Sequence, residues 1–313
     1  MRIATEENQR ISFSYWLQAA RLKFLPQGVM PVVIAGAVAF GEGSFKPVYF
    51  VVGFLAAAAV QIGLTMFNDT LDFIYGTDRK TMGNKNPFSG GSGLLTSGIV
   101  RPGQALKGIF LLYFFALTCA IYLAAQVGFE IMWIAVIGAA ISIFYSAKPF
   151  RFAYHGLGEL MMFLGYGPVL TAWGYFIHTT TISIDILLIG AIPGFLMWTM
   201  ILINEIPDYN EDRAANKRNI AYRLGPGRTK NLYIASFAVL YLYITALIIG
   251  GVLPVWCALA FLSIPMAVKA SMVAHRHYLN PIKITDSNRF MVYIYSLTTI
   301  MVAAGFLIEG LLA

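Results

Sequence analysis

Long uncharged runs separated by short polar stretches make up most of this 313-residue chain. A helix needs roughly 20 predominantly apolar residues to cross a bilayer. The pattern predicts nine transmembrane helices, near residues 15–41, 47–67, 104–126, 129–147, 157–178, 184–204, 230–251, 253–274 and 289–311. The seventh and eighth are the least clearly divided, because only a short "GVLP" stretch separates them. We therefore expect an all-α integral membrane protein with a single domain over residues 1–313.

The composition supports a membrane protein. Hydrophobic residues make up 58% of the chain and charged residues 12%, whereas a soluble domain carries about 25% charge. The net charge is +7, and every Lys and Arg except Lys46 lies in the N-terminal tail, the even-numbered loops or the helix ends beside them. This asymmetry follows the positive-inside rule. It predicts a multi-pass protein of the cell (inner) membrane with a cytoplasmic N-terminus, and it does not indicate a nucleic-acid partner.

Two acidic clusters each close an uncharged run. The first, "NDTLDFIYGTDRK", begins at Asn68, and the second, "NEIPDYNEDRAANKRN", begins at Asn204. Both open as Asn, an acid, two residues and Asp, and both go on to Asp-Arg. They end the predicted second and sixth helices, so the even offset puts both on the cytoplasmic side. Such an internal repeat is common in membrane folds, where a central site forms between two halves.

The clusters have the chemistry of a metal-diphosphate site. Residues four apart on a helix share a face, so Asn68 and Asp72 are expected on one face, and Asn204, Asp208 and Asp212 on another. Oxygen ligands suit Mg²⁺, which proteins usually hold with a few carboxylates and the substrate's phosphates. Basic residues lie beside the acids: Arg79, Lys80, Arg213, Lys217 and Arg218. A single cluster of this kind is more often a solvated surface, but the repetition favours a site.

These residues resemble the UbiA superfamily of intramembrane prenyltransferases. The first motif, NxxxDxxxxxD over residues 68–78, is similar to the branch that prenylates dihydroxynaphthoate in menaquinone synthesis. Three more stretches are similar to that branch: "AARLKFLPQGVMPVVIAG", "FYSAKPFRFAYHGLGEL" and "NEIPDYNEDRAANKRNIAYRLG". The chain departs from the branch pattern at Leu22, Asn216 and Asn219. The similarity extends from helix 1 to position 225, and the last three helices match only in hydropathy.

The resemblance implies nine helices around a central cavity, with Asp-rich cytoplasmic loops capping it. It implies Mg²⁺-dependent transfer of a polyprenyl group from an isoprenoid diphosphate to an aromatic acceptor, with 1,4-dihydroxy-2-naphthoate as the best candidate. The diphosphate would ionise to an allylic carbocation, which the acceptor carbon attacks. An apolar cavity, open to the lipid bilayer, would accommodate the isoprenoid tail.

The roles that the resemblance suggests fall on three groups of residues. The expected Mg²⁺ ligands are Asn68, Asp72, Asp78, Asn204, Asp208 and Asp212. The expected substrate contacts are Arg21, Lys23, Arg79, Lys80, Lys148 and Lys217. The expected catalytic residues are Asp72, Asp78, Asp208, Asp212, Lys217 and Tyr145. Asp69 and Glu205 lie beside the ligands and off their helix face, which leaves a supporting role open.

The sequence leaves three alternatives. A membrane terpene cyclase of the same superfamily would use the same ionisation and let the chain's own double bonds capture the cation. A prenyltransferase for another acceptor, such as homogentisate, a glycerol phosphate ether or haem, would share every motif. A secondary transporter would also show repeats and charges within the membrane, although its coupling acids would lie near the midplane, where this chain has almost none.

Overall fold

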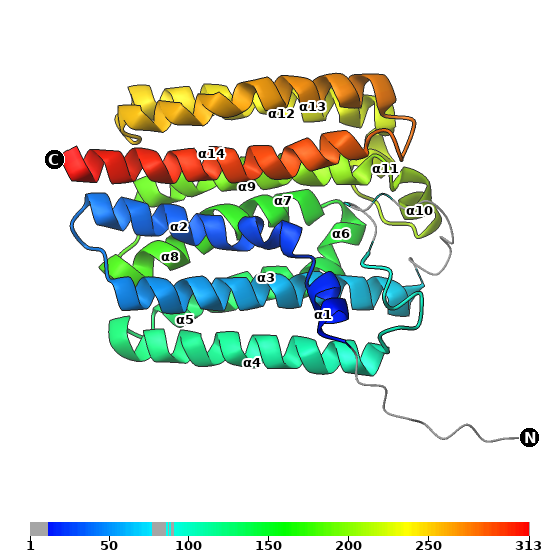
Figure 1. Cartoon of the computed structure of the whole chain (residues 1–313), viewed down its shortest axis with the longest axis horizontal. Coiled ribbons are helices and arrows are strands. Elements are labelled where there is room, and N and C mark those ends of the chain that lie inside the picture. The colour runs from blue at the N-terminus through cyan, green and yellow to red at the C-terminus, as the bar shows by residue number, and fades with distance from the viewer. Residues whose placement is uncertain (1–11, 77–85, 87, 89–90, 313) are drawn as a thin grey trace, which may run out of the picture.

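The computed structural model describes residues 12–76, 86, 88 and 91–312, and within them it contains helices and no strand. Long helices run side by side along one axis (Figure 1). The elements in chain order are α1 (Phe13–Ala20), η1 (Leu22–Phe24), α2 (Leu25–Gly41), α3 (Pro47–Tyr75), α4 (Pro102–Val127), α5 (Ile131–Ser146), α6 (Phe152–His155), α7 (Gly158–Leu164), η3 (Gly165–Val169), α8 (Leu170–Thr179), α9 (Ile184–Glu205), α10 (Tyr209–Ala214), α11 (Ile220–Leu224), α12 (Pro226–Ile249), η4 (Val255–Ser263), α13 (Ile264–His277) and α14 (Thr285–Leu312).

The all-helical membrane fold is confirmed, with one difference in the count. Eight helical segments of the described chain are long and apolar enough to span a membrane. The predicted span near 129–147 is the shorter helix α5, of 16 residues. The uncertain division between the seventh and eighth spans is correct, because α12 ends at Ile249 and η4 begins at Val255.

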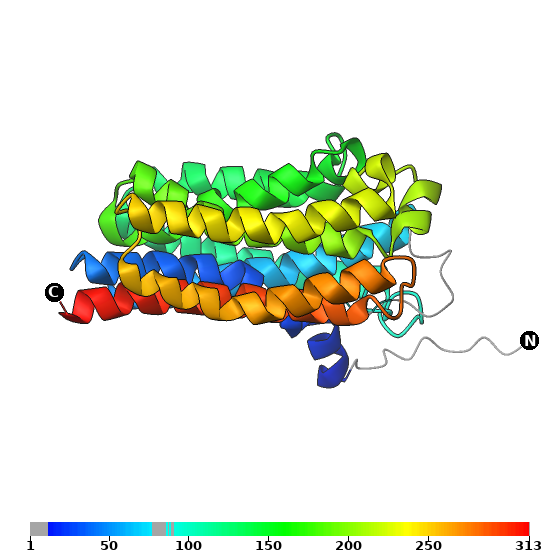
Figure 2. The same ribbon diagram turned by 90° about the horizontal axis from the view of Figure 1, so that it is seen from above.

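The two ends of the bundle differ. The short elements α1, α6, α10 and α11 gather at one end, whereas the C-terminus lies at the other (Figures 1 and 2). We call the first of these the acidic end, because α3 and α9 bring both acidic motifs there. The largest buried apolar cluster is built mainly from α2, α9, α12 and α14.

Glycine lets two central segments approach closely beneath the acidic end. A side chain at Gly167, in the π-helical turn η3, would place its Cβ 2.7 Å from the Gly190 carbonyl oxygen of α9. A real Cβ essentially never comes that close to another heavy atom. The contact fixes the segment that follows α7 against α9, and both α7 and α9 contribute residues to the cavity at the acidic end.

The first predicted span is broken at the residue expected to contact substrate. Helix α1 ends at Ala20, Arg21 adopts a left-handed conformation with φ 44° and ψ 53°, and α2 begins at Leu25. Pro26 lies in the first turn of α2, where a missing N–H costs least. A left-handed backbone is uncommon for a residue other than glycine, and such conformations cluster at functional sites. The break, which hydropathy alone does not indicate, turns Arg21 towards the interior.

Candidate active site

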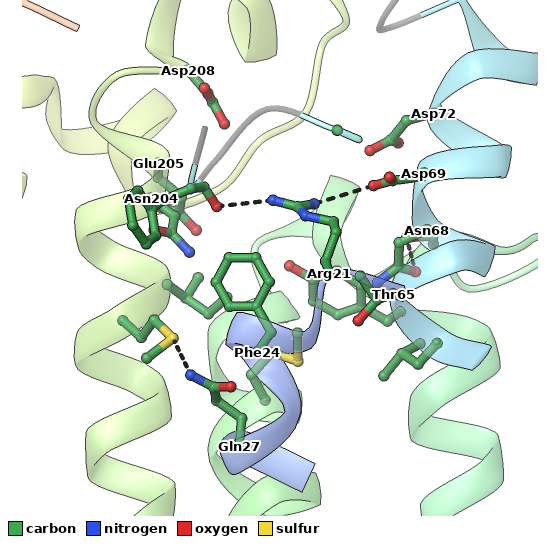
Figure 3. A pocket seen from close by; sticks show the side chains of 18 of the residues that line it. Arg21, Phe24, Gln27, Thr65, Asn68, Asp69, Asp72, Asn204, Glu205 and Asp208 are labelled. Atoms are coloured by element: carbon green, nitrogen blue, oxygen red, sulfur yellow. Dashed lines mark hydrogen bonds and ion pairs between the residues drawn. The ribbon is translucent and has the colours of Figure 1, made fainter. Parts of the chain in front are cut away.

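A cavity of about 190 Å³ opens at the acidic end of the bundle. It is lined by residues from η1, α2, α3, α5, α6, α7, η3, α9 and α10 and from the loops between them. In Figure 3, Asp72 and Asp208 lie on opposite sides of the upper part of the pocket, with Arg21 between the two walls. Among the described residues, its acidic and amide lining consists of Gln27, Gln61, Asn68, Asp69, Asp72, Asn204, Glu205, Asp208, Glu211 and Asp212. The two motifs therefore meet in one cavity, as predicted. Their first residues, Asn68 and Asn204, are 136 positions apart in the chain.

The first motif continues a transmembrane helix. Asn68 and Asp72 lie one turn apart near the end of α3, and both line the cavity. The Ser146 hydroxyl donates a hydrogen bond to Asn68 Oδ1 at 3.2 Å, which ties α5 to α3. The predicted ligand and contacts in the following stretch, Asp78, Arg79 and Lys80, fall outside the described residues.

The second motif does not continue its helix, and the prediction of one shared helical face is wrong there. Helix α9 ends at Glu205, residues 206–208 form a turn, and α10 begins after Asp208. Pro207 accounts for the break, because proline lacks the N–H that would bond the carbonyl four residues earlier. That carbonyl, on Ile203, instead accepts a hydrogen bond from Asn288 Nδ2 at 3.1 Å.

The ligands of the second motif nevertheless converge on the cavity. Asn204, Asp208 and Asp212 all line it, although three different local structures carry them. Asn288 Nδ2 also donates to Asn204 Oδ1 at 2.8 Å. Asn288 of α14 thus bonds the Ile203 carbonyl that has no helical partner because of Pro207, and it also orients the Asn204 side-chain amide.

Asp212 and Lys217 form an ion pair at the mouth of the cavity. Lys217 Nζ lies 3.5 Å from Asp212 Oδ1, and the carboxylate side chain is only 5% exposed. Burial lowers the pKa of the Lys217 ammonium, but attraction by the carboxylates of Asp212 and Asp72 outweighs it and holds the pKa well above its ordinary value. Lys217 is therefore a cation that faces both motifs. It was predicted as a substrate contact, and it lines the cavity.

Two positions that depart from the branch pattern have local explanations. Asn216 adopts a left-handed conformation with φ 53°, which asparagine tolerates better than most residues, so it serves where the pattern has glycine. Asn219 caps α11, since its Oδ1 accepts a hydrogen bond from the Tyr222 N–H at 2.8 Å. Its Nδ2 donates to Asp212 Oδ2 at 2.6 Å. Asn219 therefore fixes one oxygen of Asp212 and leaves the other to Lys217.

Arg21 is held in the cavity by the acid that follows Asn68. Its guanidinium lies 3.2 Å from Asp69 Oδ1, and each side chain of the pair is 11% exposed. Arg21 also donates to the Phe88 carbonyl, and Asp69 Oδ2 accepts from the Ser92 N–H. Asp69 therefore orients Arg21 and fastens the stretch around Ser92.

Glu205, the acid that follows Asn204, binds backbone instead. Its Oε2 accepts a hydrogen bond from the Ala221 N–H at 3.1 Å. Glu159 Oε1 accepts from the neighbouring Ile220 N–H at 2.6 Å. The two buried carboxyl groups hold the first turn of α11, and with it Asn219.

The remaining predicted residues separate into two groups. Tyr145 lines the cavity. Lys23 and Lys148 are exposed and are not among its lining residues. The Lys23 ammonium instead lies 4.2 Å from the centre of the Phe88 ring, within the range of a cation–π contact.

A second, apolar cavity of about 390 Å³ adjoins the first. It lies between α3, α4, α5 and the segments α7 to α8, and alanine, leucine, isoleucine and valine side chains dominate its lining. In the described part of the chain, five residues line both cavities, namely Gln61, Leu64, Tyr145, Met162 and Tyr166. A molecule with a charged head and an apolar chain would fit the two cavities together.

The oxygen ligands suit a cation held jointly with a substrate. Within the described residues, no three His, Cys, Asp or Glu side chains form a ready-made metal cluster. Proteins commonly bind Mg²⁺ with one or two carboxylates plus substrate phosphates and few ligands of their own. The carboxylates and amides that line this cavity match that donor set.

Sequence reasoning missed several lining residues, among them Phe24, Gln27, Gln61, Tyr166 and Glu211. The two glutamines had a signal, because an amide inside an otherwise apolar run is costly unless it has a partner. The aromatic residues had none, since Phe and Tyr are frequent throughout the chain.

Comparison with known proteins decides the family. The pattern of the UbiA prenyltransferase family matches residues 29–308. The chain belongs to the UbiA prenyltransferase family. The resemblance drawn from the motifs, and with it the prediction of a prenyltransferase, is confirmed.

Curated relatives and solved structures agree with the family. A 1,4-dihydroxy-2-naphthoate octaprenyltransferase of Bacillus subtilis is 29% identical over 81% of this chain and 79% of its own length. A 2-carboxy-1,4-naphthoquinone phytyltransferase of Synechocystis is 24% identical over 95% of this chain and 94% of its own. UbiA homologues from Aeropyrum pernix, without ligand, and from Archaeoglobus fulgidus, bound to DMAPP and Mg²⁺, share the fold. The A. pernix protein has a TM-score of 0.64 and is 16% identical, over 90% of this chain and 97% of its own. The A. fulgidus protein has a TM-score of 0.58 and is 17% identical, over 93% of this chain and 99% of its own.

Proposed function

We propose that this UbiA-family protein transfers a polyprenyl group from an isoprenoid diphosphate to an aromatic acceptor, with 1,4-dihydroxy-2-naphthoate as the best candidate. The observation that carries the proposal is the junction of a charged cavity with an apolar one. The diphosphate would lie among the acids and bases of the first cavity. The prenyl tail would extend into the second. The relatives' names support a naphthoate acceptor.

The proposed metal ligands are the oxygen-bearing residues of both motifs, Asn68, Asp72, Asp78, Asn204, Asp208 and Asp212. Bound Mg²⁺ would supply Lewis-acid stabilisation of the leaving diphosphate. The ligand set of this chain supports that choice, because carboxylate and amide oxygens favour a hard cation. A related A. fulgidus protein was solved with Mg²⁺ bound.

The protein's own cations would take part in the same step. Lys217 and Arg21 line the cavity and would neutralise charge that grows on the diphosphate as the allylic C–O bond breaks. The bonding electrons leave with the diphosphate, the prenyl carbon forms a C–C bond to the ring, and the ring loses a proton. Tyr145, where the two cavities meet, would face the acceptor. Arg79, Lys80, Lys23 and Lys148 remain proposed contacts from the motif pattern.

The apolar walls serve a further purpose. An allylic carbocation reacts with water, so transfer requires that water be kept out. The lining of the second cavity offers few polar groups to hold water. We also propose that the acidic end faces the cytoplasm of the cell, since every Lys and Arg except Lys46 lies on the predicted cytoplasmic side.

The test measures diphosphate release by the purified protein from geranylgeranyl diphosphate, with and without a panel of aromatic acceptors. We expect release that depends on 1,4-dihydroxy-2-naphthoate, stops when EDTA removes Mg²⁺ and returns when Mg²⁺ is restored. Equal release without any acceptor, with a cyclic hydrocarbon as product, would replace the proposal with a terpene cyclase. No release under any condition would reject it in favour of a transporter.

A further inference from the structure

Two glutamines lie where the charged and apolar cavities meet. Gln27 lines the charged cavity, and Gln61 lines both. Gln27 lies in the lower part of the pocket, on the far side of Phe24 from the carboxylates of Asp72 and Asp208 (Figure 3). An isoprenoid diphosphate that fills both cavities would have its reacting carbon next to the diphosphate, and therefore near this junction.

Gln27 is buried without adequate partners. Its side chain is only 1% exposed. Nε2 donates to the thioether sulfur of Met200 at 3.4 Å (Figure 3), and a thioether is a weak acceptor. In the described part of the chain, Gln27 Oε1 has no hydrogen-bond partner at all. Buried polar atoms in native proteins are rarely left unpaired, and each exception calls for an explanation.

Gln61 offers the complementary group. Its Oε1 accepts a hydrogen bond from the Tyr166 hydroxyl at 2.8 Å. Tyr166 thereby fixes the orientation of the amide, and within the described ranges Nε2 donates to no other residue. The two glutamines come from neighbouring helices that pack at Gly28, where any Cβ would lie 2.5 Å from Gln61 Cβ. The close approach of α2 and α3 thus holds an acceptor oxygen and a donor nitrogen beside one cavity.

The chemistry of this pair selects a ligand class. Gln27 Oε1 requires an O–H or N–H donor, and Gln61 Nε2 requires an acceptor. A neutral phenolic hydroxyl can do both, whereas a hydrocarbon can do neither. Among the described residues, the cations that line this cavity are Arg21 and Lys217, and both belong to its charged part. The amides themselves therefore provide no counter-charge for a carboxylate.

We infer that Gln27 and Gln61 form a subsite that recognises a ring hydroxyl of the aromatic acceptor and holds the ring against the ionising carbon of the donor. This inference rests on the proposed function and adds that the acceptor must present a free hydroxyl. Positioning of that kind matters, because reacting atoms have to lie about 3–3.5 Å apart. A cyclase would have no use for the pair.

The test compares the wild-type protein with Gln27→Met, a substitution that keeps the length of the side chain and removes the amide. The probes are 1,4-dihydroxy-2-naphthoate and its two mono-O-methyl ethers, with geranylgeranyl diphosphate saturating. We expect the KM for the dihydroxy acceptor to rise about 10- to 100-fold. The KM for the donor should stay within about twofold, because Gln27 does not reach the predicted diphosphate ligands.

The methyl ethers give the sharper readout. The wild-type protein should discriminate against the ether that blocks the recognised hydroxyl, because a site built to bond a hydroxyl rejects an analogue that lacks it. Gln27→Met should lose most of that discrimination. Gln126→Met is the matched control, since Gln126 is an exposed glutamine near the end of α4, and it should change neither value.

Several outcomes would overturn the inference. One is a folded Gln27→Met protein with the wild-type KM and the wild-type preference among the ethers. If that variant fails to fold, Gln27→Asn replaces it, because asparagine keeps the amide but withdraws it by one carbon; the same loss of discrimination is expected, and its absence overturns the inference. If the wild-type protein releases diphosphate but prenylates no aromatic acceptor, the proposed function fails first, and this result is distinct from either variant's.

Discussion

Asn68 and Asp72 lie on consecutive turns of one unbroken helix, α3, whereas Asn204 and Asp208 are separated by the break between α9 and α10. The order of residue types is nearly the same in the two motifs, and both line one cavity. The backbone beneath them differs because Pro207 has no counterpart in the first motif. Similar spacing in a sequence therefore does not guarantee similar local structure.

The partners of the two motifs differ as well. In the first, Asp69 pairs with Arg21, a cation that reaches the cavity from the broken first span. In the second, Glu205 binds the backbone of α11, and Lys217 supplies the cation. In each motif one acid, Asp69 or Glu205, binds a neighbouring segment, and one base, Arg21 or Lys217, lines the cavity nearby. Both copies of the repeat therefore reach the same cavity, and each does so by its own contacts.

The largest expected effect tests whether the two motifs are equally necessary. Asp72→Asn and Asp208→Asn should each lower kcat for diphosphate release by about 100- to 1,000-fold, because each removes a carboxylate proposed to hold the Mg²⁺ that would stabilise the leaving diphosphate. Release of diphosphate at saturating donor and Mg²⁺ measures the effect. Asp286→Asn, which changes an exposed carboxylate of α14, is the control. A variant of either motif that keeps half of the wild-type rate would contradict the shared site.

The second prediction addresses the break itself. Pro207→Ala restores an N–H that can bond the Ile203 carbonyl and displace Asn288 Nδ2. The extended helix would carry Asp208 away from its present position, and we expect kcat to fall by about 10- to 100-fold, as small misplacements do. Pro193→Ala is the control, because Pro193 is a proline inside α9 that is not among the cavity residues.

The outcome separates two explanations of the second motif. If Pro207→Ala is as inactive as Asp208→Asn, the break is essential for placing the carboxylate. If it keeps the wild-type kcat while Pro193→Ala also does, the tertiary contacts of α10 place Asp208 whatever the helix does, and the break has no role in positioning it.

Part of this arrangement could be read from the sequence. Hydropathy located the spans because a bilayer imposes length and apolarity on each of them. The repeated acids predicted the location of the cavity, because two similar sets of carboxylates at the same end of two apolar helices favour one shared site. The break at Arg21 could not be read in this way. Its left-handed conformation depends on contacts with Asp69 and Phe88, which are distant in sequence.

The hydrogen-bond partners of the Gln27 and Gln61 amides could not be predicted from the sequence either. Each is a single polar residue in an apolar run, and such residues usually find a partner on a neighbouring helix. Gln61 does so through Tyr166, whereas Gln27 finds only a sulfur atom. The difference depends on which side chains face each other, and that is a property of packing. Sequence periodicity alone does not contain it.

The smallest expected effect concerns how each motif's side chains are oriented. Asn219→Ser keeps a hydroxyl that can cap α11 but cannot hold Asp212 Oδ2. We therefore expect kcat to fall about 3- to 10-fold, the typical net cost of one hydrogen bond, with little change in Tm. The first motif offers the comparison. Ser146→Ala removes only a neutral hydroxyl that donates to Asn68 Oδ1 at 3.2 Å, and its effect should stay below about threefold.

Measuring kcat and Tm together distinguishes orientation from stability in this pair. Asn219→Ala removes both the cap and the bond to Asp212, so it should lose the same rate as Asn219→Ser and some Tm besides. If Asn219→Ser has the wild-type kcat, the short bond at 2.6 Å does not control the carboxylate, and Lys217 alone positions Asp212. If Ser146→Ala instead has the larger effect, the first motif depends on its orientation more than the second, and the ranking of the two is reversed.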